Sequence, residues 1–163
     1  MSRDDMGSGA EMAWTRGVRL GVDVGTVRIG VAVCDPDGIL ATPLVTVARR
    51  LETDESVIPA DMLEIARLVA DHGTVEVVVG LPLNLAGVEG PAAVHARAYA
   101  DRLAAVIAPV PVVLTDERMS TVAATRRLSD RGVRGRRQRA VVDQAAAVEI
   151  LQGWLDLQRR RAG

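Results

Sequence analysis

The stretch VRLGVDVGTVRIGVAVCD, residues 18–35, decides the fold because two short runs of β-branched residues flank one Gly-Thr pair. We predict antiparallel strands over residues 18–23 and 28–35, joined as a hairpin through Gly25 and Thr26. Alternation along the first strand places Asp23 on the same face as Gly21 and Gly25. Neither glycine has a side chain, so we expect an open pocket around the Asp23 carboxylate. The alternative is that Asp23 only caps the turn.

Outward from this hairpin, strand-like and helix-like segments alternate. The turn signal DPDG precedes a third predicted strand, and later Val-rich runs predict two more, at 39–47, 75–79 and 111–115. Apolar residues at helical spacing predict helices over residues 59–72, 91–108, 121–129 and 139–159. This order predicts an α/β fold in which a three-strand meander and parallel strands form one mixed five-stranded sheet, with helices on both faces.

Length and composition indicate one folded domain. The 163 residues suit a single domain, and a 48% share of apolar residues is enough for a packed core. We expect a flexible N-terminal tail over residues 1–16, the domain over 17–158 and a basic C-terminal tail over 159–163.

The sequence also favours a cytoplasmic protein. No apolar run is long enough to span a membrane, and the acidic N-terminus does not resemble a signal peptide. The single cysteine, Cys34, cannot form an internal disulfide, which fits a reducing compartment and a place in the core. His72 and His95 are expected on helix surfaces rather than as ligands.

Charge is unevenly distributed although the net charge is only −1. Residues 126–139 contain seven arginines and one acid, whereas residues 52–76 contain seven acids and one arginine. Arginine suits bidentate contacts with phosphate, and the scarcity of aromatic residues argues against recognition by base stacking. The basic segment therefore indicates an anionic partner, although a solvated loop without any partner is the alternative.

Further carboxylates fall where a site could form. Asp116 and Glu117 follow the fifth predicted strand, at the sheet edge where ligand crevices form in open α/β sheets. Neighbouring strand residues face opposite ways, so we expect one of the two acids to enter the crevice and the other to bond Arg118 or cap a helix. The alternation alone does not say which.

Asp143 lies on the apolar face of the last predicted helix, together with Ala146, Ala147, Ile150, Leu151 and Trp154. A carboxylate that faces a core is costly unless it is paired or bound to metal. The alternative is that the helix starts near Val142 and that Asp143 is a first-turn acid favoured by the helix dipole.

Three carboxylates with no suitable His or Cys describe an oxygen-donor site for Mg²⁺ or Mn²⁺. Two such ions, about 4 Å apart, can activate a water and stabilise a leaving oxygen in a phosphoryl displacement. We therefore expect two metal ions.

Five motifs together resemble the YqgF (RuvX) family, within the RNase H-like, RuvC-related nucleases. They are VDVGTVRIGVAV at 22–33, ATPL at 41–44, VGLPLN at 79–84 with GVEG at 87–90, DERMST at 116–121, and VDQAAA at 142–147 with ILQGWL at 150–155. The resemblance extends over residues 18–156. Two departures are mild: Val27 stands where the family often has lysine, and Ser120 where threonine is frequent.

The resemblance implies an RNase H-like fold and a cytoplasmic, metal-dependent nuclease that processes the 5′ end of precursor 16S rRNA. The family's acidic site would fall on Asp23, Glu117 and Asp143, with Glu117 favoured over Asp116. The expected nucleic-acid contacts come from arginines near this site and in the basic segment: Arg28, Arg118, Arg134, Arg136, Arg137 and Arg139.

Two other functions stay open. The shared fold allows a branched-DNA resolvase, which would favour a homodimer over a monomer. The chain could also be a non-catalytic RNA-binding factor in ribosome assembly. An actin-like ATPase is disfavoured, because the chain is too short for a second nucleotide-closing domain.

Overall fold

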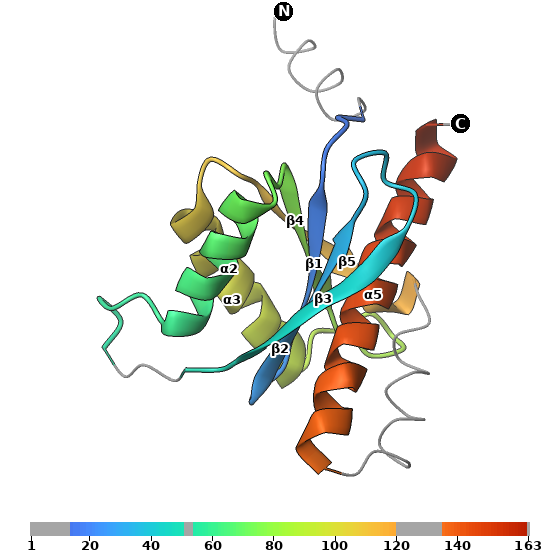
Figure 1. Ribbon diagram of the computed structural model, residues 1–163. Helices are drawn as coiled ribbons and strands as arrows, with labels where there is room; N and C mark the ends of the chain where they lie inside the picture. Colours follow the sequence, from blue (N-terminus) through green and yellow to red (C-terminus); the bar gives the residue numbers. More distant parts are fainter. Residues whose placement is uncertain (1–13, 51–53, 120–134, 163) are drawn as a thin grey trace, which may run out of the picture.

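The computed structural model describes residues 14–50, 54–119 and 135–162, which form one mixed sheet with helices on both faces (Figure 1). The elements, in chain order, are β1 (Arg19–Val24), β2 (Arg28–Cys34), β3 (Ala41–Ala48), α2 (Ala60–Asp71), β4 (Glu76–Leu81), α3 (Pro91–Ile107), β5 (Val112–Asp116), the 3₁₀ turn η1 (Glu117–Met119) and α5 (Gly135–Ala162). Among these described residues, no helix is long and apolar enough to cross a membrane.

The sheet has the strand order β3-β2-β1-β4-β5. β1 pairs antiparallel with β2, and β2 with β3, which makes the meander. β4 runs parallel to both β1 and β5. The predicted fold class is therefore confirmed. β3 begins two residues later than predicted, because the Asp35 carboxylate accepts the backbone N–H groups of Ile39 and Leu40, at 3.0 and 2.7 Å, and holds them in the turn.

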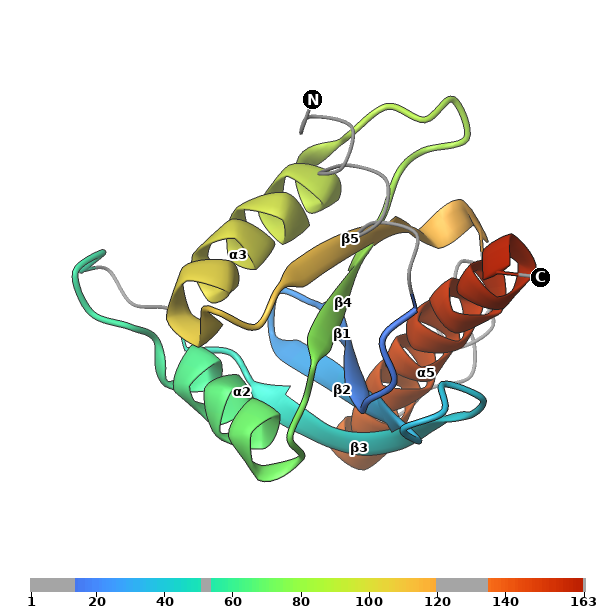
Figure 2. The same ribbon diagram turned by 90° about the horizontal axis from the view of Figure 1, so that it is seen from above.

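The helices divide between the two faces of the sheet (Figure 2). α2 and α3 cover one face, where branched side chains such as Leu20, Val22, Val77 and Val79 form the larger core cluster. α5 covers the other face, where small side chains such as Ala32 and Ala147 and the buried Cys34 form a second cluster. Burial raises the pKa of the Cys34 thiol, in agreement with its predicted place in the core.

α5 is longer than predicted at both ends. Residues 159–162, expected as a tail, continue the helix, because no Gly or Pro interrupts the chain before Gly163 and three arginines in the last turn suit the negative end of the helix dipole. The helix predicted over residues 121–129 lies outside the described residues, as does most of the expected N-terminal tail.

Close packing of α5 on the sheet depends on glycines. A Cβ at Gly30 would lie 2.0 Å from the backbone oxygen of Asp143, and one at Gly21 would lie 2.6 Å from Cβ of Leu151. The space above Gly21 is therefore filled by the helix. The expectation that Gly21 opens a pocket beside Asp23 is wrong, because the missing side chain serves to seat α5.

Candidate active site

The candidate site is centred on Asp23, near the carboxyl end of β1. Asp23 pairs with Gly30 of β2 and lies one residue beyond the pair formed by Val22 and Val79, which puts Gly80 of β4 on its other side. A Cβ at Gly80 would lie 2.5 Å from Cδ1 of Ile150. The neighbouring positions Gly30, Asp23 and Gly80 therefore all face α5. Asp23 is only 7% exposed, yet both of its cross-strand neighbours lack a side chain. The two glycines on the adjacent strands thus allow α5 and Glu117 to come close to this carboxylate.

Glu117, the first residue of η1, enters the same space directly after β5. Val113 packs into the cluster beneath α5, so Thr115 and then Glu117 continue towards that face. Oε2 of Glu117 lies 2.8 Å from the position that a Cβ on Gly80 would take. Glu117 is 6% exposed. The structure therefore places the Asp23 and Glu117 side chains on the same face, beside the same glycine.

Asp116 is the other acid of the pair, and it is occupied by Arg118. Its carboxylate accepts from the backbone N–H of Arg118 at 2.9 Å and from Nη2 at 2.7 Å. The Arg118 guanidinium holds the pKa of Asp116 below its usual range. Nη1 of Arg118 also donates to the backbone oxygen of Leu85, at 3.3 Å. The expectation that the second acid bonds Arg118 is confirmed, and the pair ties the end of β5 to the loop of residues 82–90.

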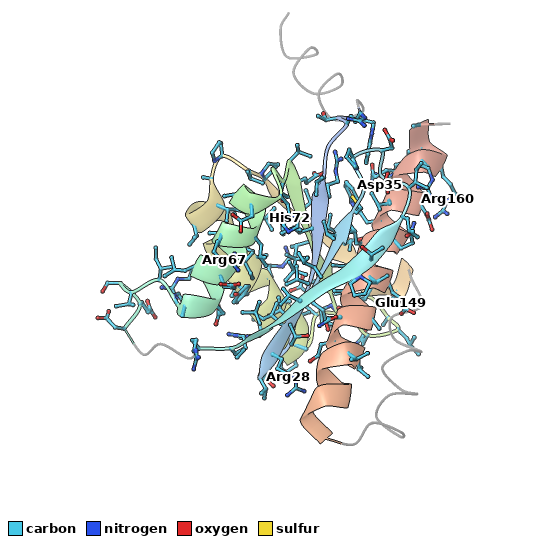
Figure 3. The ribbon with its side chains drawn as sticks, viewed as in Figure 1. Arg28, Asp35, Arg67, His72, Glu149 and Arg160 are labelled. Atoms are coloured by element: carbon cyan, nitrogen blue, oxygen red, sulfur yellow. The ribbon has the colours of Figure 1, made fainter. Side chains whose placement is uncertain are left out.

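Asp143 lies about two turns inside α5, which begins at Gly135. The alternative that Asp143 is a first-turn acid is therefore wrong. Its backbone oxygen sits over Gly30, the cross-strand partner of Asp23. Its carboxylate accepts from Nε of Arg28 at 2.7 Å, with the two side chains 23% and 24% exposed. Arg28 lies at the end of the sheet near the first turns of α5 (Figure 3).

A metal ion in this site would have to be held by the carboxylates of the α5 face. Among the residues that the structure describes, no three His, Cys, Asp or Glu side chains are grouped closely enough to hold a metal ion. Asp23 and Glu117 nevertheless supply the carboxylate oxygens that Mg²⁺ and Mn²⁺ prefer. Asp143 is adjacent, but its Oδ2 is engaged by Arg28. The donor chemistry fits a hard divalent cation held by two carboxylates. Asp143 could add its Oδ1, since Arg28 engages only Oδ2, but its side chain would have to move closer to the other two acids.

The predicted nucleic-acid contacts have different outcomes. Arg28 and Arg118 are described, and both form ion pairs, with Asp143 and Asp116. Arg134 lies outside the described residues. For three more arginines the structure describes the helical backbone of α5 but not the side chains: Arg136, Arg137 and Arg139.

One polar cluster was not predicted from the sequence. His95, expected on a helix surface, has its Nε2 2.8 Å from Nη1 of Arg49. Asp61 and Tyr99, joined by a 2.6 Å hydrogen bond, lie beside them. Two features of the sequence mark residues of this cluster: the pair Arg49-Arg50 directly after a predicted strand, and the single tyrosine of the chain. Neither feature predicts a contact between distant segments.

Comparison with known proteins gives a consistent result. The sequence profile of the family described as "RuvX: Holliday junction resolvase" matches residues 17–157. A protein from Nocardia farcinica is 56% identical over 141 residues, which cover 86% of this chain and 78% of that protein. One from Mycobacterium ulcerans is 55% identical, covering 95% and 88%. Both carry the name "Putative pre-16S rRNA nuclease".

Among solved structures, RuvC from Thermus thermophilus in complex with a Holliday junction substrate has a similar fold. The TM-score is 0.53 at 15% identity, over 89% of this chain and 97% of that one. This likeness supports an RNase H-like, RuvC-related arrangement of the sheet and helices.

Proposed function

The chain belongs to the RuvX family, and on that basis we propose that it is a metal-dependent endonuclease that matures the 5′ end of precursor 16S rRNA. The relatives at about 55% identity carry that rRNA nuclease name over most of this chain. The proposed setting is the cytoplasm, where ribosomes are assembled.

The observation that carries the proposal is the placement of Asp23 and Glu117 beside Gly80. Two carboxylates buried in one place disfavour each other's ionised form unless a cation lies nearby. A fold held only by packing would be more stable with apolar side chains at these positions. Their joint burial at the carboxyl ends of β1, β4 and β5, where ligand crevices form, supports a cation-binding role.

In the proposed mechanism, Asp23 and Glu117 hold the cation through their carboxylate oxygens, with Asp143 as a third ligand. When bound, Mg²⁺ or Mn²⁺, in one or two ions, supplies an activated water and stabilises the leaving oxygen of the phosphodiester. The glycines at positions 30 and 80 let the Asp143 backbone and the Glu117 carboxylate approach the sheet beside Asp23. Arg28 orients Asp143 and, once displaced from it, is free to contact a phosphate.

Substrate binding is proposed to rest on the basic segment of residues 126–139. Its arginines precede and enter α5, the helix that carries Asp143. Arginine forks bind phosphate oxygens bidentately and without reading sequence, so this segment would grip the RNA backbone.

A branched-DNA resolvase is the second candidate, because the matching family is described by that activity. The two are separated by incubating the protein with Mg²⁺ or Mn²⁺ and either a precursor 16S 5′-leader RNA or a four-way DNA junction. We expect cleavage of the RNA and not of the junction. Symmetric nicking of the junction, by a homodimer rather than a monomer, would favour the resolvase. Binding of RNA with no cleavage of either substrate would favour a non-catalytic assembly factor.

A further inference from the structure

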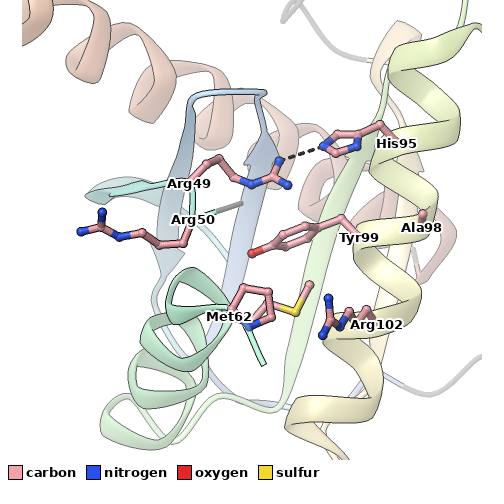
Figure 4. A pocket seen from close by; sticks show the side chains of 8 residues that line it. Arg49, Arg50, Met62, His95, Ala98, Tyr99 and Arg102 are labelled. Atoms are coloured by element: carbon pink, nitrogen blue, oxygen red, sulfur yellow. Dashed lines mark hydrogen bonds between the residues drawn. The ribbon is translucent and has the colours of Figure 1, made fainter. Parts of the chain in front are cut away.

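A basic pocket lies on the other face of the sheet from Asp23, between the end of β3, α2 and α3. It has a volume of about 210 Å³ (Figure 4). Its lining includes three arginines, a histidine, the tyrosine and a methionine: Arg49, Arg50, Arg102, His95, Tyr99 and Met62. No residue of this pocket has a role in the proposed cleavage reaction.

Arg49 is the buried cation of this pocket, with its side chain only 9% exposed. Nη1 donates to the backbone oxygen of Gly25 and to Nε2 of His95, both at 2.8 Å. The guanidinium carbon lies 4.9 Å from the centre of the Tyr99 ring. Nε is buried and has no hydrogen-bond partner among the described residues. The guanidinium is therefore fixed in position, and its Nε–H donor makes no hydrogen bond to the described residues.

Asp61 is the buried acid beneath the pocket, and its hydrogen bonds are already made. It accepts from the hydroxyl of Tyr99 at 2.6 Å and from the backbone N–H of Arg50 at 2.7 Å. Nε of Arg49 is 3.7 Å from Asp61, close enough for charge attraction but too far for a hydrogen bond. Of the three arginines, Asp61 thus balances the charge of only one, Arg49.

The remaining charge of the pocket is positive. Arg102 donates from Nη2 to the backbone oxygens of Glu55 and Val57, which are uncharged acceptors. Arg50 lines the pocket and forms no ion pair with the described residues. Its guanidinium extends away from Tyr99 (Figure 4), and because the side chain is exposed it can turn to a phosphate bound in the pocket. Because arginine has no acceptor, Nε2 of His95 must accept from Arg49 and its proton must be on Nδ1. Burial and the charge of Arg49 lower the pKa of His95, which keeps the ring neutral.

We propose that this pocket binds the phosphate group of a nucleotide, either free in solution or within an RNA strand. Among the residues that the structure describes, three arginines line this pocket and one buried carboxylate, Asp61, lies beside Arg49. Arginine forks match the geometry of phosphate oxygens. Tyr99 and Met62 add an apolar wall against which the attached sugar can pack. The pocket lies across the sheet from Asp23 and Glu117, so its phosphate is not the one that would be cleaved.

Arg49 connects the pocket to the candidate active site. The Gly25 carbonyl that it binds belongs to the β1–β2 turn, two residues after Asp23. A phosphate that binds the Arg49 guanidinium therefore contacts a group that is hydrogen-bonded to the hairpin carrying Asp23. Binding itself does not depend on nuclease activity and can be tested without metal.

The test is an NMR titration of the full chain, labelled at arginine Nε, in EDTA and at constant ionic strength. Inorganic phosphate, AMP and a short 5′-phosphorylated RNA are the three probes. We expect saturable shifts at Arg49, Arg50 and Arg102. Saturation by AMP identifies a free nucleotide as sufficient, whereas saturation by RNA alone identifies the strand as the source. Linear, unsaturable shifts with all three probes would overturn the proposal.

Two variants and one control distinguish the pocket from general surface charge. Arg50→Gln leaves the buried charges intact, and the double variant Arg49→Gln with Asp61→Asn removes both buried charges together, so that neither is left unpaired. Each is expected to weaken phosphate binding by about tenfold or more, the loss expected for charge-assisted hydrogen bonds. Arg67→Gln, on the exposed side of α2 where Arg67 pairs with Asp71, should bind as the wild type does. Equal weakening by Arg67→Gln, or none by the pocket variants, would contradict the proposal, whatever the outcome of cleavage assays.

Discussion

The two faces of the sheet bury their acids in different ways. On the α2/α3 face, Asp61 is completely buried and has a tyrosine hydroxyl, a backbone amide and an arginine around it. On the α5 face, Asp23 and Glu117 lie beside Gly80, where glycines let α5 pack closely on the sheet. In the first arrangement one acid lies beside a buried arginine, whereas in the second two acids lie on the same face of the sheet. Asp61 therefore serves the structure, whereas the pairing of Asp23 with Glu117 on one face supports the proposal that these two acids hold a cation.

The largest effect is expected where the α5 face is most closely packed. Gly30→Ala would place a Cβ 2.0 Å from a backbone oxygen of α5, which no side-chain rotation can relieve. We expect a loss of more than about 3 kcal/mol in the free energy of unfolding, measured by urea denaturation. Gly90→Ala is the matched control, since nothing lies within 4 Å of its Cβ, and it should cost no more than about 1 kcal/mol. Equal losses of unfolding free energy in the two variants would mean that the packing of α5 does not depend on a glycine at position 30.

The second effect concerns the satisfied acid on the opposite face. Tyr99→Phe removes the hydroxyl that donates to Asp61 at 2.6 Å and leaves a buried carboxylate oxygen unpaired. We expect a destabilisation of about 1–3 kcal/mol, again from urea denaturation. Burial and the hydrogen bond to Asp61 raise the pKa of Tyr99, so the hydroxyl is a donor throughout the usual pH range. A neutral substitution would contradict the structural role assigned to Asp61.

The predictability of the fold follows from local patterns. The hairpin, the meander and the parallel strands could be predicted because alternation, turn residues and helical spacing are encoded within short segments. The start of β3 could not be predicted, because the Asp35 carboxylate accepts hydrogen bonds from two backbone amides, and the spacing of apolar residues does not reveal such bonds. The end of α5 lies beyond the predicted one, because apolar spacing stops before the last turn although no Gly or Pro interrupts the chain there.

The site was predictable only in part, since it depends on pairings between distant segments. Asp23 and Asp143 were candidates from their faces alone. That Glu117 rather than Asp116 turns towards α5 is seen only in the folded chain, where Glu117 lies beside Gly80 and Asp116 bonds Arg118. The ion pair between Arg28 and Asp143 joins residues 115 positions apart, and no sequence pattern predicts it.

A third effect concerns binding rather than folding. Replacing Arg136 and Arg137 together with Ala should weaken RNA binding and flatten its dependence on salt. If both contact phosphates of a single strand, the slope of log K against log salt should fall by roughly 1.4. Filter binding at several salt concentrations, in EDTA, measures this slope. An unchanged slope would remove these two residues from the proposed RNA contact.

The smallest effect is a change in the pH dependence of stability. The pKa of His95 is lowered by burial and by Arg49, so the unfolded chain takes up a proton at a higher pH than the folded chain. The associated stability is complete above the ordinary histidine pKa of about 6.5 and is lost as the pH falls below it. His95→Gln keeps an acceptor for Arg49 but does not titrate, and should flatten the change between about pH 7 and pH 5. Thermal unfolding across that range is the measurement, and the same slope in both proteins would contradict the neutral state of His95.

The most direct test of the central claim is cleavage of a precursor 16S 5′-leader RNA in Mg²⁺ or Mn²⁺ by four purified proteins. These are the wild type, Asp23→Asn, Glu117→Gln and Asp116→Asn, each checked for folding by circular dichroism. We predict that Asp23→Asn and Glu117→Gln fold but lose metal-dependent cleavage, whereas Asp116→Asn, whose carboxylate is turned away from α5, retains most of it. Wild-type rates in Asp23→Asn and Glu117→Gln, or equal loss in all three variants, would contradict the assignment of the α5 face as the active site.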